Sequence, residues 1–522
     1  MKKSYIYILI VILMITLVII NQKKDSKSFT VNGVKYSTSL DGNSIDSFPS
    51  KGDYEVEVNC TNAKGSWNYS KWVARINNIT GKVSCNISFT SKTPTNINNY
   101  IKGLAGTTQG TGQLVNEMAS IDNSTFTASG NKLAQSSYSN LSNDATYPFT
   151  WSDTDKTWTS TNHTDSKTST ISFNVSTNGY YQMCYMQQSE KNYDYTTIKK
   201  DNTQIKSLKG ISNSSYECFY LGNLTTSNTI TISYSKDSSA STQPDNVVFY
   251  FQTGTYNENI QNVSIGYRYE GKNPNNYIYF NNELWRIIGV FDASSHGKTG
   301  EYLTKIIRND SLGGYAWDKS NKNNWATSSL YNLLNTNYYN ATDGTSGGNC
   351  YQDSTSITGN CDYTETGIQS EYRAMVENVT WYLGGKDSAS YTAEAFYTGE
   401  RDSIYSGNTA STTTGYIGLM YASDYGYSVL SSSCARTTNL GSYSTSACGG
   451  SSWLKKETYE RTVTHCSASS GYSFNLNYTA ALNSFDANNG YVTRPVLYLK
   501  SNVQVYAGDG SISKPYQIKL AS

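Results

Sequence analysis

The feature that most limits the fold of this chain is the recurrence of short segments in which apolar and polar residues alternate. In NTITISY (228–234), Ile230, Ile232 and Tyr234 share one face, because successive side chains of a strand point to opposite sides. Similar segments recur from residue 28 onward and are separated by Gly, Asn and Asp turns. This pattern predicts a mainly β protein made of several domains.

Length and composition set limits on the architecture and on the partners. At the usual domain size of roughly 100–200 residues, the 522 residues allow about three or four domains. The 46 tyrosines against 7 prolines indicate tyrosine-faced β cores rather than leucine-packed helices. The net charge is +1 and charged residues make up 16% of the chain, so nucleic acid is not an expected partner.

The N-terminal segment MKKSYIYILIVILMITLVIINQKK contains an apolar run over residues 5–20 that only Thr16 interrupts. The run is short for a spanning helix, which needs ~17–25 residues, but flanking polar residues can sit at the interfaces. No A-x-A-like cleavage site follows the run, although a cleaved signal peptide is the alternative. We therefore expect a signal-anchor transmembrane helix, a single-pass membrane protein and extracytoplasmic domains.

The nine cysteines fall into local couples that suit disulfides. None forms C-x-x-C and the three histidines lie far apart, which argues against a metal site. Disulfides imply an oxidising compartment outside the cytoplasm, whereas buried reduced thiols are the alternative. Cys466 remains without a partner, and the expected pairs are Cys60–Cys85, Cys184–Cys218, Cys350–Cys361 and Cys434–Cys448.

Turn signals and shifts in composition divide the chain further. The last module holds both strands and two apolar stripes at helical spacing, one at Leu330–Tyr338 and one at Tyr372–Leu383. The Asn281-Asn282 pair suits a tight hairpin turn. The predicted order is a cytoplasmic tail and anchor helix (1–27), a small β-sandwich (28–93), a linker (94–118), a jelly-roll β-sandwich (119–253), a connector (254–265) and an α+β domain (266–522).

Two loops of the middle module, SEKNYD (189–194) and YSKDSSASTQPDNVVF (234–249), carry a resemblance. With them the module resembles jelly-roll, carbohydrate-binding-like modules of bacterial surface proteins, in which paired loops lie at one end of the sandwich. Carboxylate oxygens suit Ca²⁺, although such acids also cap turns and bond the loop backbone. Glu190, Tyr193, Asp194, Asp237 and Asp245 are the expected residues of an accessory site here. We expect the acids to cap turns and bond the loop backbone and therefore expect no cofactor; calcium binding is the alternative.

The last module carries a second resemblance. WRIIGVF, NWATSSLYNLLNTNYYNAT, YIGLMYASDYGYS, SSWLKKETYE and GYVTRPVLYLK occur in the order seen in uncharacterised bacterial surface domains. Those domains are similar to the C-type-lectin-like fold, in the branch that includes formylglycine-generating enzymes and diversified ligand-binding proteins. The family's W-T-x-T-P is replaced here by ERTVTHCSAS, so the start of the loop surface is expected to differ.

Enzyme motifs receive little support. The sequence GTSGG (344–348) matches G-x-S-x-G, but it lies in a polar loop rather than between a strand and a helix. A formylglycine-type oxidase needs a cysteine pair that binds copper, whereas Cys434 and Cys448 suit a loop staple. No pair of carboxylates stands in a setting that indicates glycan hydrolysis. We therefore expect no enzyme; a glycan-processing enzyme and a structural cell-envelope component without a soluble ligand are the alternatives.

The stretch between Val463 and Thr493 carries one formal charge, Asp486, and is rich in Tyr, Asn, Ser and Gly. These residues are favoured in binding loops, because tyrosine is a rigid amphipathic contact and the others form adaptable hydrogen bonds. In the family it resembles, ligand-facing loops lie just before the final strand. A passive loop is the alternative. We expect residues 466–491 to form loops that bind a glycan or a protein in an adhesion function, with contacts from Tyr472, Asn475, Asn477, Tyr478, Asn483, Asp486, Asn488 and Tyr491.

Overall fold

The computed structural model describes residues 28–521, apart from residues 32, 161, 163, 191–192, 210–214, 239–244, 354–360, 402–411 and 445. The predicted anchor helix and its apolar run over residues 5–20 lie outside the described residues. Among the residues that are described, no helix is long and apolar enough to span a membrane.

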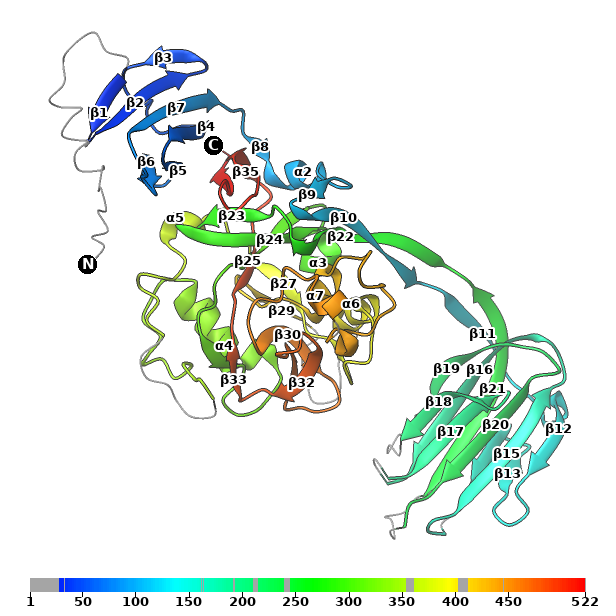
Figure 1. Ribbon diagram of the computed structural model, residues 1–522. Coiled ribbons are helices and arrows are strands. Elements are labelled where there is room, and N and C mark those ends of the chain that lie inside the picture. Colours follow the sequence, from blue (N-terminus) through cyan, green and yellow to red (C-terminus); the bar gives the residue numbers. More distant parts are fainter. Residues whose placement is uncertain are drawn as a thin grey trace. The chain divides into compact units, whose positions relative to one another are not determined.

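The chain is mainly β and forms two compact units (Figure 1). Unit 1 comprises Met1–Ala119 and Val263–Ser522, and unit 2 comprises Ser120–Asn262. Unit 2 is therefore inserted into unit 1, where a linear series of domains was expected. The predicted linker (94–118) is part of the folded unit, because it contains strands of the largest sheet as well as a short helix. The predicted connector (254–265) is likewise part of the fold, because strands β21 and β22 occupy most of it.

The first part of unit 1 is a five-stranded sheet with the order β1-β2-β7-β4, in which β3 pairs with β2. Strand β7 alternates buried and exposed side chains, and its Ile87 and Phe89 are fully buried. The strands are β1 (Ser28–Val31), β2 (Val34–Leu40), β3 (Asn43–Ile45), β4 (Tyr54–Thr61) and β7 (Val83–Ser91), with a hairpin of β5 (Lys64–Asn68) and β6 (Val73–Asn77).

A ten-stranded sheet forms the centre of unit 1 and joins segments far apart in sequence. Its Asn281-Asn282 turn has positive φ at both residues, as predicted for the hairpin of β23 and β24. Its strands are β8 (Thr95–Asn96), β9 (Thr108–Gln109), β10 (Thr111–Asp122), β22 (Ile260–Asn273), β23 (Tyr277–Phe280), β24 (Glu283–Phe291), β25 (Leu303–Arg308), β34 (Val496–Tyr498), β35 (Val503–Ala507) and β36 (Tyr516–Leu520).

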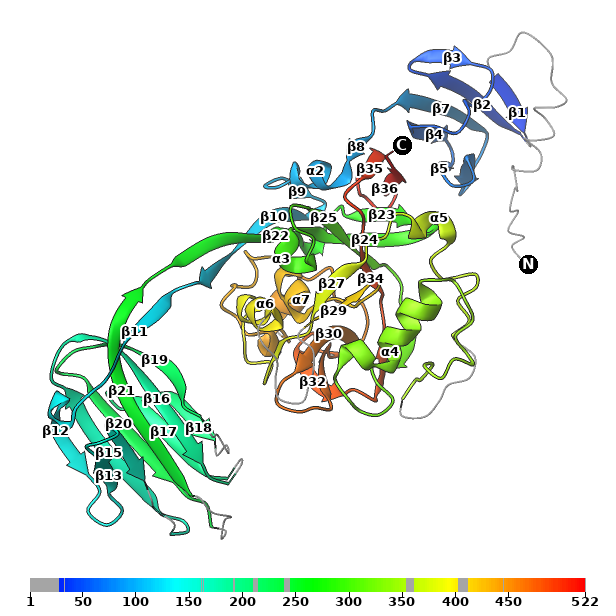
Figure 2. The ribbon, with the colours of Figure 1, turned by 180° about the vertical axis from the view of Figure 1, so that it is seen from behind.

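A six-stranded sheet and several short helices complete unit 1. Helix α2 (Ile97–Lys102) lies on one side of the ten-stranded sheet, and α6, α7 and the six-stranded sheet lie on the other (Figures 1 and 2). The six strands are β26 (Gly314–Ala316), β28 (Gly385–Lys386), β30 (Glu460–Cys466), β31 (Tyr472–Leu476), β32 (Leu482–Asp486) and β33 (Gly490–Val492). The other elements of this part are α3 (Ala293–His296), α4 (Ser329–Asn332), a π-helix (Leu333–Tyr338), α5 (Ser370–Arg373), α6 (Ala393–Arg401), α7 (Ala422–Ser428), α8 (Ser446–Gly449) and the pair β27 (Val379–Tyr382) and β29 (Thr412–Gly415).

The two predicted helices have different outcomes. The stripe at Leu330–Tyr338 is helical, and its Leu333 and Leu334 are fully buried. The second stripe is helical only at its start, in α5, and is wrong from Val379 onward, because Val379 begins strand β27, which pairs with β29. Val379, Trp381 and Leu383 are buried at every second position, so the period of a strand competes with the helical spacing at this point.

Unit 2 is a β-sandwich in which two antiparallel sheets enclose one core. Ile230, Ile232 and Tyr234 are fully buried in it, as their alternation predicts. One sheet holds β11 (Thr125–Lys132), β13 (Phe149–Ser152), β14 (Thr157–Ser160), β16 (Gly179–Gln188), β19 (Glu217–Leu224) and β21 (Asn246–Asn257). The other holds β12 (Tyr138–Asn143), β15 (Thr168–Val175), β17 (Tyr195–Lys200), β18 (Thr203–Lys209) and β20 (Thr229–Ser235).

Four disulfides join the cysteine couples that were expected. Cys60–Cys85 links β4 to β7 and Cys184–Cys218 links β16 to β19, in both cases between residues directly opposite each other. Cys466 is free and buried. The four bonds fit an oxidising environment outside the cytoplasm.

Candidate binding surface

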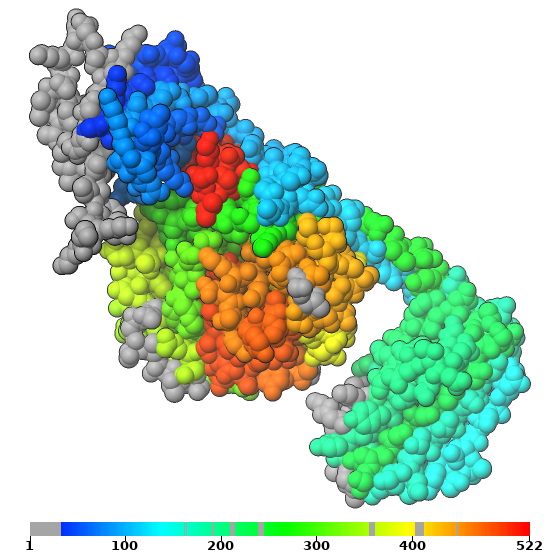
Figure 3. Space-filling model, viewed as in Figure 1, coloured from blue at the N-terminus to red at the C-terminus, as the bar shows by residue number. Residues whose placement is uncertain are grey.

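The stretch expected to form ligand-binding loops consists largely of strands. Strands β31, β32 and β33 account for most of residues 472–492, and β31 and β32 form a hairpin. Phe474 and Leu476 are fully buried, which fixes one face of β31 against the core. The loop prediction is therefore wrong. Ser473 and Asn475 on the other face of β31 are also fully buried, so the core encloses this polar segment on both sides. In Figure 3 the orange surface of unit 1 belongs to the segment that contains these strands.

The eight predicted contact residues differ in exposure. Tyr478 is 64% exposed and Tyr472 is 39% exposed. Asn483 is also exposed. Asn475 is fully buried and donates a hydrogen bond to the Ser473 carbonyl at 2.9 Å, so its prediction as a surface contact is wrong. The half-buried members of the set are Asn477, Asp486, Asn488 and Tyr491.

Two of the half-buried polar side chains stabilise the local backbone. The Asn477 side-chain oxygen accepts hydrogen bonds from the backbone N–H groups of Thr479 and Ala481, at 2.9 and 3.1 Å. The Asp486 carboxylate accepts a hydrogen bond from the Asn321 amide at 3.0 Å. These contacts stabilise the β31–β32 turn and the end of β32, so the two side chains have a structural role in this surface.

An aromatic cluster of four partly exposed rings lies on this sheet: Tyr459, Tyr478, Phe485 and Tyr491. Tyr459 is at its centre, stacked on Tyr491 with centroids 5.3 Å apart and an interplanar angle of 15°. Its ring lies 6.1 Å from that of Tyr478 and 5.8 Å from that of Phe485. The structure thus brings the predicted Tyr478 and Tyr491 together, while Tyr459 and Phe485 were not foreseen.

The backbone of Tyr459 adopts an uncommon conformation. Its φ is 55°, in the left-handed region that non-glycine residues rarely enter. Such strain is kept where the surrounding structure requires it, and it is frequent at functional sites. At this position it accompanies the stacking of Tyr459 on Tyr491 immediately before β30.

A buried arginine lies behind the cluster. Arg461 is 1% exposed, and its guanidinium carbon lies 4.8 Å from the centroid of the Tyr491 ring. It donates hydrogen bonds to the Ser473 hydroxyl at 2.8 Å and to the backbone carbonyls of Ala487 and Asn489. Among the described residues, no carboxylate contributes to the shift of the Arg461 pKa. Burial lowers the Arg461 pKa to about 9, which the neighbouring Tyr491 partly opposes. The rings therefore shield a positive charge that only neutral groups solvate.

Tyr472 does not belong to the cluster. It lies opposite Asp486 in the β31–β32 hairpin, whereas Phe485 lies opposite Ser473. Because side chains alternate along a strand, Tyr472 and Phe485 leave the hairpin on opposite faces. Tyr472 is therefore an exposed tyrosine close in sequence to the cluster but on the other side of the hairpin.

Two carboxylates of the accessory site predicted in unit 2 bond to other groups of the protein. Asp194 is fully buried, and its carboxylate accepts hydrogen bonds from the backbone N–H groups of Glu190 and Asp237 at 3.2 and 3.1 Å. Asp245 forms a buried ion pair with Lys236 at 2.6 Å. Tyr193 is exposed at 55%. Among the described residues, no three His, Cys, Asp or Glu side chains gather as a metal site would require. The Asp194 and Asp245 carboxylates thus stabilise the loops.

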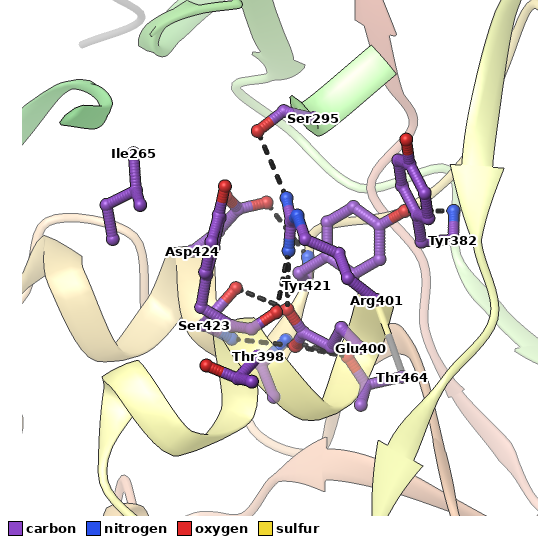
Figure 4. Close-up of polar contacts among 12 residues, drawn as sticks. Ile265, Ser295, Tyr382, Thr398, Glu400, Arg401, Tyr421, Ser423, Asp424 and Thr464 are labelled. Carbon is purple, nitrogen blue, oxygen red and sulfur yellow. Dashed lines mark hydrogen bonds and ion pairs between the residues drawn. The ribbon is translucent and has the colours of Figure 1, made fainter. Parts of the chain in front are cut away.

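The densest group of buried charges lies elsewhere in unit 1, around helices α6 and α7 (Figure 4). Asp424 accepts hydrogen bonds from Arg268 at 2.8 Å and from Lys305 at 2.5 Å. The two cations keep the Asp424 pKa below its usual value although burial opposes this. Burial lowers the Lys305 pKa to about 8 even though Asp424 opposes that shift.

A second buried carboxylate lies next to this group. Glu400 accepts hydrogen bonds from the Ser423 hydroxyl at 2.5 Å and from the Thr464 hydroxyl at 2.8 Å. Burial raises its pKa, which Arg401 partly offsets. The two carboxylates and the side chains that donate to them are almost completely buried, so the group links α6 and α7 to β22, β25 and β30 rather than presenting chemistry to a ligand.

Comparison with known proteins adds little. No protein-family model and no curated protein matches the chain. One similar solved structure is the secreted serine protease VesC from Vibrio cholerae, at 9% identity over 36% of this chain and 32% of that chain, with a TM-score of 0.16. This chain thus spans about a third of the length of that protease.

Two carbohydrate-binding modules are also similar. One is TmCBM61 in complex with beta-1,4-galactotriose, at 9% identity over 23% of this chain and 88% of that chain, with a TM-score of 0.16. The other is a family 35 carbohydrate-binding module from an environmental isolate, at 12% identity over 28% and 98%, with a TM-score of 0.13. Likenesses at such TM-scores support no conclusion about the activity or the ligand of this chain.

Proposed function

We propose that the protein acts outside the cytoplasm, anchored to the cell surface, and binds a glycan through the aromatic cluster of unit 1. The observation that carries this proposal is the cluster itself: four partly exposed rings in mutual contact on a sheet that the core holds rigid. Tyrosine rings supply large contact areas with little loss of side-chain entropy, because only two torsions must be fixed. Rings already packed on one another lose even less on binding.

The composition around the cluster supports a neutral ligand. Asn483 is exposed on the same face of the β31–β32 hairpin as Phe485, and it offers an amide for hydrogen bonds. The guanidinium that lies against the Tyr491 ring, that of Arg461, is buried and already bonded to neutral groups. An aromatic surface edged by amides suits sugar rings, whose faces are apolar and whose rims carry hydroxyls. A protein with an uncharged epitope is the alternative ligand.

The anchored, extracytoplasmic setting is part of the same proposal. Its support is the set of four disulfides, which persist in oxidising compartments, together with the apolar run over residues 5–20. Protease treatment of intact cells tests this part directly. Cleavage of unit 1 in intact cells is expected, and complete protection would contradict it.

A glycan and protein array tests the ligand. The wild type should bind a restricted set of neutral glycans, and Tyr478→Ala should lose that signal because it removes the most exposed ring of the cluster. Tyr472→Ala is the matched control, since Tyr472 is exposed but lies on the other face of the hairpin. An equal loss of glycan binding in both variants would contradict the proposal. It would also be contradicted if neither the wild type nor the Tyr472→Ala control bound to the array.

A further inference from the structure

Unit 2 carries its own row of aromatic side chains on the face of its six-stranded sheet that points away from the core. Phe126, Tyr180, Tyr220 and Tyr256 form this tyrosine platform, and each is partly exposed. They come from β11, β16, β19 and β21, four strands that lie side by side in both ribbon views (Figures 1 and 2).

Strand register places the four rings on one face. Phe126 lies directly opposite Tyr256, and Tyr180 lies opposite Gly254, two residues before Tyr256. Residues two apart on a strand share a face, so Tyr180 and Tyr256 point the same way. The alternate residues Phe249 and Phe251 of β21 face the core and are buried. The platform is thus the outer surface of the sheet.

The rings are preorganised. Tyr220 and Tyr256 stack with centroids 4.4 Å apart and an interplanar angle of 7°, and Phe126 stacks on Tyr220 at 5.5 Å and 30°. Tyr180 contacts Tyr256 at 5.5 Å. A Cβ atom at Gly254 would come within 2.4 Å of the Phe126 ring, so glycine is required there for the ring to lie over the strand. The rings therefore follow one another in the order Phe126, Tyr220, Tyr256 and Tyr180, with successive centroids 5.5, 4.4 and 5.5 Å apart.

Polar groups adjoin the rings without adding net charge. The Gln182 amide donates a hydrogen bond to the Gln252 side chain at 2.8 Å, and the two lie on the same outer face. Lys132 reaches this face from β11, where its ammonium lies 4.2 Å from the centroid of the Tyr250 ring. Glu258 follows the end of β21 and raises the pKa of Tyr220 together with burial and the neighbouring tyrosines. The two charges are opposite in sign.

This chemistry selects among ligands. Single-stranded nucleic acid also stacks on aromatic rings, but it needs a row of cations for its phosphates, and Lys132 is one ammonium already held over a ring. An acidic polysaccharide needs the same. A neutral sugar chain requires only flat apolar rings and amide or hydroxyl partners along its length, which the platform offers.

We propose that the tyrosine platform of unit 2 is a second ligand site, which binds a neutral oligosaccharide along the row Phe126, Tyr220, Tyr256 and Tyr180. This site is independent of the aromatic cluster of unit 1. It also differs from the predicted accessory site, because none of the loop acids of that site belongs to the platform. A polymeric glycan long enough to reach both sites is then bound more tightly than by either site alone, because the second contact is intramolecular.

The test uses the full-length protein carrying Tyr478→Ala, so that the unit 1 cluster does not contribute. Neutral β-linked hexasaccharides of glucose, galactose, mannose and N-acetylglucosamine are titrated by calorimetry, with hexagalacturonate as the acidic comparison. Binding of at least one neutral hexasaccharide is expected. Adding Tyr220→Ala and Tyr256→Ala should weaken it by about tenfold or more. Tyr220→Phe keeps the ring and should stay within about threefold.

Controls separate binding from folding. Tyr195→Ala removes an exposed tyrosine of the other sheet and should not change the affinity. Tyr220→Ala alone, with its melting curve and its Cys184–Cys218 bond checked, replaces the double variant if that variant does not fold. The proposal is overturned if no neutral hexasaccharide binds at millimolar concentration, if hexagalacturonate binds more tightly, or if the alanine variants bind like the parent. Dimerisation through this face, lost in the same variants, would also overturn it.

Discussion

Replacing Asp424 by asparagine is expected to destabilise unit 1 and to leave unit 2 unchanged. Asp424 lies between Arg268 and Lys305, and all three side chains are at most 3% exposed. Asparagine has nearly the same size but no charge, so two buried cations lose their counter-ion. Breaking a buried pair by removing one partner costs ~3–5 kcal/mol, because the remaining charge cannot be solvated. Two cations share this carboxylate, so we expect the loss to fall at the upper end of that range.

Hydrogen exchange at increasing urea concentration measures this effect in each unit separately. Peptides from α7 and β25 report on unit 1, and peptides from β16 and β21 report on unit 2 as an internal reference. Asp310→Asn is the matched control. It breaks the ion pair of Asp310 with Lys456, and the Asp310 side chain is 71% exposed. Such a surface pair contributes ~0–1 kcal/mol. Equal losses in the two variants would refute the argument that burial sets the energetic role of Asp424.

Three further results are expected. Burial lowers the His465 pKa from 6.5 to about 4, so between these two pH values the unfolded chain binds a proton that the folded chain does not. The free energy of unfolding should therefore fall by about 3 kcal/mol as the pH drops from 6.5 to 4. The same pH dependence in His465→Gln would contradict the assignment to His465. In the variant Cys350→Ser/Cys361→Ser, the free energy of unfolding should be about 3 kcal/mol lower, because the disulfide no longer restricts the unfolded chain. A decrease of less than ~1 kcal/mol, measured by urea denaturation, would contradict this argument. Cys466 is buried and free, so a maleimide should label one thiol per chain after unfolding and none before; labelling of the folded protein would show that this thiol is accessible.

Local sequence patterns predict the parts of the fold that depend on neighbours in the chain. The alternation of Ile230, Ile232 and Tyr234 places the core face of β20, and the Asn281-Asn282 pair places the hairpin turn. The disulfide couples are found because each joins cysteines separated by 11 to 34 residues. The insertion of unit 2 leaves no such local signal, since β10 and β22 become neighbours only in the folded sheet.

The candidate binding surface, too, could be predicted only where it depends on local sequence. Tyr478 and Tyr491 follow from composition, because exposed tyrosines are common in polar segments that bind ligands. Tyr459 and Phe485 complete the cluster through cross-strand contacts, and the positive φ of Tyr459 has no local sequence signal of the glycine or asparagine kind. Asn475 was misplaced because an amide buried in a network around Arg461 has the same sequence appearance as an exposed one.

The buried charges around Asp424 were also missed. Arg268, Lys305 and Asp424 lie as far as 156 residues apart in sequence, on β22, β25 and α7. Each charge taken alone is typical of a solvated face, and their convergence depends on the packing of α7 against the sheets. A sequence pattern cannot report such a group, because none of its members is within helical or strand spacing of another.

The most direct test of the proposed binding surface is the affinity of Tyr478→Ala relative to Tyr472→Ala for the ligand that the array identifies, measured by surface plasmon resonance. Both positions are exposed tyrosines of one hairpin segment, and only Tyr478 contacts the aromatic cluster. A loss of about tenfold or more for Tyr478→Ala, with an affinity within about twofold of the wild type for Tyr472→Ala, is predicted. Equal affinities in the two variants would contradict the central claim.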